Sequence, residues 1–227
     1  MAVIGFDVFG TLVDPAGIAD AVRPHAGERT PAFLAEWRRS QLEFAFRRAA
    51  MGRFRPFDEV TRAALERAVA VTGIEVPEAA RPELVAGWTR LPAFAEAADA
   101  LDVLRAAGHR CLAFSNGTPG GLQTLLSDNG LDAHLDGVLS VEPVGTYKPA
   151  PAVYAYLVER GGADAAATWL VSGNAWDVIG ARAAGLRAAW VRRAPETAFD
   201  PWEEAPDVVV ADLSELAADA SFAPGGR

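Results

Sequence analysis

Short runs in which nearly every residue is apolar recur along the chain, and they predict strands that are buried on both faces. The first run covers residues 2–6, and further runs lie at 109–116, 136–141, 167–172, 186–191 and 207–212. Such runs are typical of parallel sheets, in which helices cover both faces. Most of the intervening segments carry apolar residues at helical spacing, and these segments are 94–108, 119–130 and 150–162. The alternation predicts an α/β fold with a doubly wound, Rossmann-like parallel sheet.

Residues 15–93 interrupt this alternation, because they contain no convincing strand. Thr30 and Pro31 predict an N-cap and a first turn, and the helices expected after them cover 31–50, 58–72 (ended by Gly73) and 79–89. We therefore expect a helical cap domain at 15–93 and an α/β core domain made of 1–14 and 94–227. The insert follows strand 1 at the edge where open sheets bind ligands. It is well placed to cover a site, although a decorative insertion is the alternative.

Composition and charge narrow the class of protein. The 227 residues are 51% hydrophobic and carry a net charge of -9, from 21 basic and 30 acidic side chains. This balance allows a sizeable core and argues against a disordered chain and a nucleic-acid surface. The single cysteine, Cys111, excludes an intrachain disulfide and a multi-cysteine metal site. No segment reaches the roughly 18 apolar residues of a membrane helix, and no basic leader precedes an apolar stretch. We expect a soluble, cytoplasmic protein without a membrane partner.

Polar side chains end several predicted strands. An acid at the tip of a buried strand is costly in a core unless it is paired. Because parallel strands end at one edge of the sheet, we expect these side chains to converge. The set consists of Asp7, Ser115, Asn116, Ser172, Asn174 and Asp177, together with Lys148 ahead of a predicted helix.

This ordered set resembles the haloacid dehalogenase (HAD) superfamily and, more closely, its L-2-haloacid dehalogenase (type II) family. The motifs FDVFGTLVD, WRRSQLEF, FSNGTP, TYKPAPAVY and SGNAWD follow in the family's order over nearly the whole chain. The resemblance implies metal-independent hydrolysis of short (S)-2-haloalkanoic acids to (R)-2-hydroxy acids, with no cofactor, by a homodimer. Asp7 would attack the substrate and form an aspartyl ester. Lys148 would lie between Asp7 and Asp177, and the halide would leave toward Arg38 and Asn116.

Arg38 is the notable residue of the insert. Leu34 and Leu42 lie at helical spacing from it, so it belongs to an apolar helix face. Arg39 instead faces Glu43, four residues on, as an ordinary surface pair. An arginine on a buried face needs an anion. The alternative to a halide is a structural salt bridge.

The resemblance also assigns roles around Asp7. Ser172, Asn174 and Asp177 are candidates to orient or deprotonate the water that hydrolyses the ester. Substrate-binding candidates are Thr11 and Ser115 for the carboxylate, Tyr154 as a weaker candidate, and an apolar lining of Val8, Phe9, Leu42, Phe57 and Trp176, residues that could equally be core. Phe9 departs from the family pattern, which has tyrosine there, and this departure leaves the substrate preference open.

Position 9 also bears on the main alternative, a HAD phosphatase. Phosphatases usually hold a second aspartate there, which protonates the leaving alkoxide. Phe9 cannot do so, whereas a halide leaves without a proton. Asp7 and Asp177 could still hold a metal. Two further alternatives are a hydrolase that opens another electrophilic small acid and a non-catalytic binding protein, which would be expected to lack some site residues.

Overall fold

The computed structural model describes residues 1–223 and contains a six-stranded sheet in which all neighbouring strands are parallel. The strand order is β3-β2-β1-β4-β5-β6. The strands are β1 (Val3–Phe6), β2 (Arg110–Ser115), β3 (Gly137–Ser140), β4 (Thr168–Ser172), β5 (Arg187–Val191) and β6 (Val208–Val210). Each corresponds to a predicted apolar run, and the doubly wound α/β prediction is confirmed. The order reverses between β1 and β4, and this reversal opens a crevice at the carboxyl ends of the strands.

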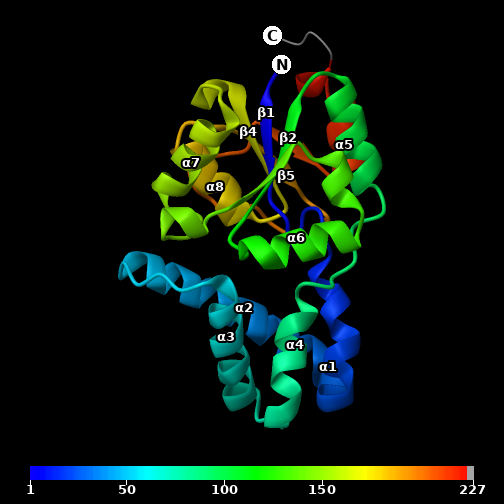
Figure 1. Cartoon of the computed structure of the whole chain (residues 1–227), viewed down its shortest axis with the longest axis vertical. Helices are drawn as coiled ribbons and strands as arrows, with labels where there is room; N and C mark the ends of the chain where they lie inside the picture. The colour runs from blue at the N-terminus through cyan, green and yellow to red at the C-terminus, as the bar shows by residue number, and fades with distance from the viewer. Residues whose placement is uncertain (224–227) are drawn as a thin grey trace.

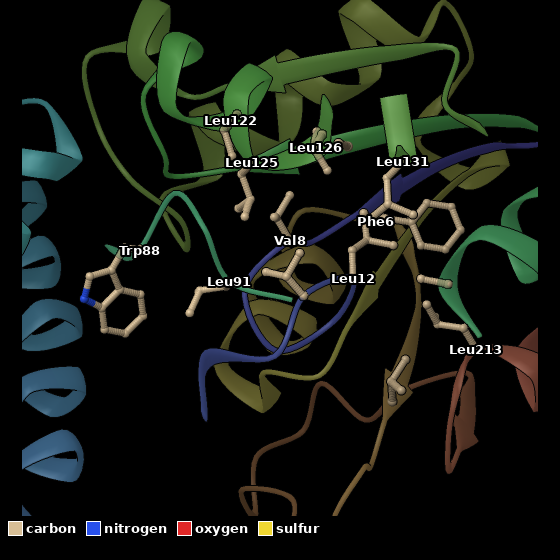
Figure 2. Close-up of a cluster of buried hydrophobic side chains, with 14 of the residues drawn as sticks. Phe6, Val8, Leu12, Trp88, Leu91, Leu122, Leu125, Leu126, Leu131 and Leu213 are labelled. Carbon is tan, nitrogen blue, oxygen red and sulfur yellow. The ribbon is translucent and has the colours of Figure 1, made fainter. Parts of the chain in front are cut away.

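Helices cover both faces of the sheet (Figure 1). Ile4 and Phe6 of β1 pack in one apolar cluster with leucines of α5 (Ala97–Ala106), α6 (Pro119–Asp128) and α9 (Leu213–Ala218). Figure 2 shows part of this cluster, including Phe6, Val8 and the α6 leucines Leu122, Leu125 and Leu126. Val3 belongs to the opposite cluster, which includes residues of α7 (Pro151–Gly161) and α8 (Ala175–Ala183). The strand is therefore apolar at every position because both faces are buried.

Gly5 allows helix α7 to lie close to the central strand. A Cβ atom built on Gly5 would lie 2.6 Å from Cδ2 of Leu157, closer than packed carbon atoms come. The glycine thus sets the spacing between the helix layer and β1, the strand that ends at Asp7.

Residues 15–93 form a helical region at one end of the sheet (Figure 1). Its α-helices are α1 (Ala19–Ala26), α2 (Thr30–Ala50), α3 (Phe57–Thr72) and α4 (Arg81–Gly87). Gly73 ends α3 in a left-handed conformation, φ 64°, as expected of a C-cap glycine. The fragment 1–14 and 94–223 holds the sheet, while residues 224–227 of the expected core domain lie outside the described residues. Whether the two parts are separate domains stays a prediction.

Two details of the helical region differ from the expectations. Helix α1 was not predicted, because only Val22 and Ala26 are buried in it and Pro24 interrupts its pattern. Thr30 is not an N-cap; its hydroxyl donates to the carbonyl of Gly27 at 2.7 Å, within the turn that precedes α2. Among the described residues, no helix has both the length and the apolar character needed to span a membrane.

Candidate active site

Asp7 follows β1 directly and is 5% exposed. Its backbone N–H donates to the carbonyl of Val171 at 2.9 Å, which extends the β1–β4 pairing to the edge of the sheet. Its two carboxylate oxygens have different surroundings. Oδ2 accepts hydrogen bonds from Asn174 Nδ2 at 2.7 Å, Thr11 Oγ1 at 3.2 Å and Ser172 Oγ at 3.3 Å. Within residues 1–223, Oδ1 accepts only from Lys148 Nζ, at 3.2 Å.

Lys148 is 1% exposed and joins two carboxylates. Its Nζ lies 3.2 Å from Asp7 Oδ1 and 2.8 Å from Asp177 Oδ2, and it also donates to the carbonyl of Phe114 at 2.8 Å. Three acceptors thus match the three N–H bonds of an ammonium group. Burial acts to lower the pKa of Lys148, but the charges of Asp177 and Asp7 outweigh it and raise that pKa above its usual value. The lysine is therefore a fixed cation.

Asp177 lies in the first turn of α8 and is fully buried. Its Oδ1 accepts from the hydroxyl of Tyr154 at 2.7 Å, while Oδ2 faces Lys148. Burial raises the pKa of Asp177; the charge of Lys148 opposes this rise and that of Asp7 adds to it. Burial, followed by the charge of Asp177, raises the pKa of Tyr154 well above its usual value. The tyrosine therefore stays a neutral donor to the carboxylate.

A small cavity lies between this edge of the sheet and the helical region. Its volume is about 20 Å³, which is room for about one water molecule. The structure is therefore closed around Asp7, and a haloacid fits only if the cavity widens. Its lining is formed by Asp7, Phe9, Arg38, Leu42, Phe57, Ser115, Asn116, Asn174 and Trp176.

Arg38 reaches this cavity from α2 and is held loosely. Its Nη1 donates to Oε1 of Gln41 at 3.4 Å, and its guanidinium carbon lies 5.9 Å from the centre of the Trp88 ring. Burial lowers the pKa of Arg38, and the charge of Asp7 partly offsets this. In the described part of the chain no carboxylate forms a salt bridge with Arg38, so the structural ion pair considered above is not observed there. The neighbouring Arg39 does pair with carboxylates.

The structure does not bring every predicted substrate-binding residue to the cavity. The hydroxyl of Thr11 is taken up by Asp7 and by the N–H of Gly173, at 2.8 Å. Val8 is fully buried in the core. Tyr154 lies behind Asp177. None of Thr11, Val8 and Tyr154 lines the closed cavity, and their role as substrate contacts stays a prediction. Ser172 and Lys148 lie one layer behind the wall, in contact with Asp7.

Sequence reasoning missed four contributors to the site. Gln41 lies three residues from Arg38, a spacing that would have revealed the contact. Trp88, which the sequence analysis did not single out, has its ring beside the Arg38 guanidinium. The hydroxyl of Tyr147 accepts from the N–H of Arg55 at 3.0 Å and donates to its carbonyl, joining the residue before Lys148 to the loop before α3. The carbonyl of Phe114 has no sequence signal, because every residue carries one.

The donor set offers little for a divalent cation. Residues 1–223 contain no cluster of three or more His, Cys, Asp or Glu side chains suited to a metal ion. Lys148 already occupies the space between Asp7 and Asp177. A cation that bridged these two carboxylates would have to displace the ammonium group.

Comparison with known proteins identifies the family. The family model for haloacid dehalogenase-like hydrolases matches residues 1–185. The (S)-2-haloacid dehalogenase of Pseudomonas sp. (strain YL) is 34% identical over 213 residues, which are 92% of this chain and 90% of the relative. That of Xanthobacter autotrophicus is 34% identical over 233 residues, 93% and 91% of the two chains.

Solved structures agree with the sequence comparison. The L-2-haloacid dehalogenase of Xanthobacter autotrophicus with covalently bound chloropropionic acid superposes with a TM-score of 0.90 at 31% identity, covering 96% of this chain and 97% of that one. The chain therefore belongs to the haloacid dehalogenase-like hydrolases and, within them, to the L-2-haloacid dehalogenase family.

Proposed function

We propose that this hydrolase cleaves the carbon–halogen bond of short (S)-2-haloalkanoic acids and releases (R)-2-hydroxy acids through an ester on Asp7, without a metal. One observation carries the proposal: a buried carboxylate with one lightly bonded oxygen faces Arg38 across a small cavity. The relatives named above, one of them with chloropropionic acid covalently bound, support it. Homodimer formation and a cytoplasmic location stay predictions.

In the first step, Asp7 Oδ1 attacks the α-carbon on the side opposite the halogen. A carbon–oxygen bond forms while the carbon–halogen bond breaks, and the halogen leaves with the bonding electron pair, so the centre is inverted. Oδ1 is the better nucleophile because Oδ2 already accepts three hydrogen bonds. This is covalent catalysis, which divides one difficult displacement into two steps.

Arg38 and Asn116 are suited to receive the halide. The side-chain oxygen of Asn116 accepts from the backbone N–H of Lys148 at 2.9 Å, which leaves its NH₂ group for the cavity. Arg38 contributes a positive charge with few competing bonds. For the substrate carboxylate, Ser115 replaces Thr11 as the donor. Its oxygen accepts from the N–H of Gly117 at 3.1 Å, so its proton is available to a ligand.

In the second step, water attacks the ester carbon of Asp7 and negative charge develops on Oδ2. Asn174, Thr11 and Ser172 already donate to this oxygen, an arrangement that acts as an oxyanion hole. The bond from the Asp7 carbon to Oδ1 then breaks, and the hydroxy acid leaves with that oxygen, which takes up one of the water's two protons. Asn174 orients the water because it lines the cavity. The water's other proton is taken up by Asp177, whose pKa is raised: Lys148, which contacts both carboxylates, gives one proton to Asp177 and takes one from the reacting water, so the lysine keeps its charge.

The other candidate functions have less support. A phosphatase needs an acid at position 9 for the alkoxide, and Phe9 offers none. Hydrolysis of another electrophilic small acid would use the same Asp7 ester. A non-catalytic protein would be expected to have lost part of the polar network, yet Asp7, Lys148 and Asp177 are all present and bonded to one another.

Halide release from the two enantiomers of 2-chloropropionate tests the proposal, with EDTA present and a phosphate ester as control. We expect chloride from the S enantiomer alone, with no turnover in Asp7→Asn. In a single turnover in ¹⁸O-water with enzyme in excess, the first lactate formed should carry ¹⁶O from Asp7. Phosphate release that depends on Mg²⁺, without chloride, would contradict the proposal.

A further inference from the structure

A second cavity lies beside the reaction cavity, and Phe9 and Phe57 line both. Its volume is about 50 Å³. It lies between the helical region, which contributes Thr61, Val85 and Trp88, and the start of α6, which contributes Thr118 and Leu122. The mechanism proposed above makes no use of this space.

The walls of this cavity present hydrocarbon although three threonines contribute to them. Thr61 Oγ1 donates to the carbonyl of Phe57 at 2.9 Å and accepts from Gln41 at 3.0 Å. The hydroxyl of Thr89 donates to the carbonyl of Ala86 at 2.9 Å. The hydroxyl oxygen of Thr118, the N-cap of α6, accepts from the N–H of Gly121 at 3.3 Å. The hydroxyls of Thr61 and Thr89 thus donate to the backbone, and only the O–H of Thr118 is left without an acceptor within residues 1–223, so the cavity suits a mainly apolar group.

The rest of the lining is apolar except for Asp58, an exposed residue of α3. Leu122 and Val85 contribute aliphatic groups. Trp88 contributes its ring, and its indole N–H has no hydrogen-bond partner within residues 1–223. Figure 2 shows the indole nitrogen directed toward the helices of the 15–93 region and away from Leu122. The unpaired donor is therefore not aimed at the α6 side of the cavity.

Phe9 stands between the two cavities together with Phe57, and its ring is held by packing alone. Its ring meets Trp88 edge-on, with 6.2 Å between ring centres, and its Cε2 would lie 3.5 Å from a Cβ built on Gly117. A phenylalanine ring has no hydroxyl through which a hydrogen bond could fix it. Rotation of the half-buried ring, or its removal, would therefore join the reaction cavity to the apolar space behind it.

We propose that the apolar cavity behind Phe9 is the subsite for the alkyl chain of 2-haloalkanoic acids longer than propionate, and that Phe9 sets the accepted chain length. This inference rests on the proposed function. The reaction cavity, at about 20 Å³, has little room for substituents on the α-carbon. A longer chain has to continue past a wall residue, and beyond Phe9 it finds apolar surface instead of the charged edge of the sheet.

A comparison of a long-chain and a short-chain substrate tests the inference. The ratio of kcat/KM for (S)-2-chlorohexanoate to that for (S)-2-chloropropionate is measured in four proteins: the parent, Phe9→Ala, Val85→Phe and Val69→Phe. We expect the ratio to rise about 10-fold or more in Phe9→Ala, which joins the cavities, and to fall by a similar factor in Val85→Phe, which fills the far wall. Val69→Phe is the matched control, because Val69 is an equally half-buried valine that lines a different cavity; its ratio should match the parent.

The outcomes separate this inference from the proposed function. If the parent releases chloride from chloropropionate but the ratio is the same in Phe9→Ala and Val85→Phe, the subsite is refuted and the dehalogenase proposal stands. If no protein releases chloride, the dehalogenase proposal fails. Calorimetric binding of hexanoate and propionate to the four proteins then decides the subsite: tighter hexanoate binding in Phe9→Ala and weaker binding in Val85→Phe supports it, and equal binding overturns it. Melting temperatures identify any variant that fails to fold.

Discussion

The two sides of the reaction cavity are built differently. On the sheet side, Asp7, Lys148 and Asp177 are almost fully buried, and each is bonded to at least one of the others. On the helical side, Arg38 makes one long hydrogen bond, and Leu42 and Phe57 offer only apolar surface. The sheet side thus holds charges in fixed positions before any substrate arrives, which is how electrostatic catalysis avoids reorganisation. The helical side can adjust to substrate and halide.

This contrast predicts different costs of substitution. Groups on the sheet side support each other's charges, so removal of one leaves buried carboxylates unpaired and affects both stability and rate. Groups on the helical side have few partners within the protein, so their removal should affect rate or specificity with little effect on folding. Three measurements test the contrast, in order of expected effect.

The largest effect should follow substitution of Lys148, which is the only lysine in the sequence. In Lys148→Met, Asp7 and Asp177 lose their shared cation, so we expect the free energy of unfolding to fall by about 3–5 kcal/mol. We also expect kcat for halide release to fall about 10³-fold. Lys148→Arg keeps the charge, but its planar guanidinium does not match three acceptors around one nitrogen, so it should restore neither quantity fully. Urea unfolding and chloride release measure both. A stable, active Lys148→Met would contradict the idea of a mutually supporting network.

A smaller, more selective effect is expected for Arg38. In Arg38→Met we expect kcat to fall about 10²-fold, because the halide loses its cation. The free energy of unfolding should change by less than about 1 kcal/mol, since Arg38 has no ion pair in the described chain. Arg39→Met is the control; its exposed pairs with Glu36 and Glu43 should make it nearly neutral for both quantities. Loss of stability without loss of rate in Arg38→Met would show that Arg38 is structural.

The smallest effect concerns pH. The pKa of Asp177 is raised in the folded protein, mainly by burial. Activity should therefore fall on the acidic side at a pH above the ordinary aspartate range, as Asp177 becomes protonated. The Tyr154 hydroxyl favours the charged carboxylate. Tyr154→Phe should raise the pKa further and move this acidic limit to higher pH in a kcat–pH profile.

The same pKa shift fixes the sign of the stability effect. For a carboxyl whose pKa is raised on folding, the contribution to stability is present below the unfolded pKa and is lost as pH rises through the folded pKa. Between the unfolded and the folded pKa of Asp177, the free energy of unfolding should therefore fall less steeply with rising pH in Asp177→Asn than in the parent. If the acidic limit of activity is unchanged in Tyr154→Phe, protonation of Asp177 is not the cause of the loss of activity at low pH.

The strands were easier to predict from sequence than the helices of the 15–93 region. A strand buried on both faces, such as Val3–Phe6, is apolar at every position. This pattern can be recognised in the sequence without knowing which elements pack against the strand. Helix α1 buries only two side chains, so its periodicity is weak. Thr30 illustrates a second limit, because a threonine before a helix can bond forward as a cap or backward to a turn.

For the site, the order of motifs along the sequence indicated which residues lie close together. It was less informative about the direction in which each side chain points. Asp7, Ser115 and Asn174 lie at or just after strand ends and do line the cavity. Thr11 belongs to the same motif as Asp7, yet the turn after β1 points its hydroxyl back to Asp7 and Gly173. Direction within a turn depends on local dihedral angles and on the strand beside it, neither of which a motif encodes.

The sequence by itself determined the sheet, the insertion of helices after the first strand, and the supply of one nucleophilic carboxylate, one lysine and one arginine on an apolar face. These follow from burial patterns within single elements. The family resemblance already placed Lys148 between Asp7 and Asp177. Only the tertiary structure decided the distances of these ion pairs, the absence of a carboxylate partner for Arg38 within residues 1–223, and the position of Phe9 and Phe57 between two cavities. Those features depend on how separate elements pack against each other, because a cavity and a long-range ion pair belong to several elements at once.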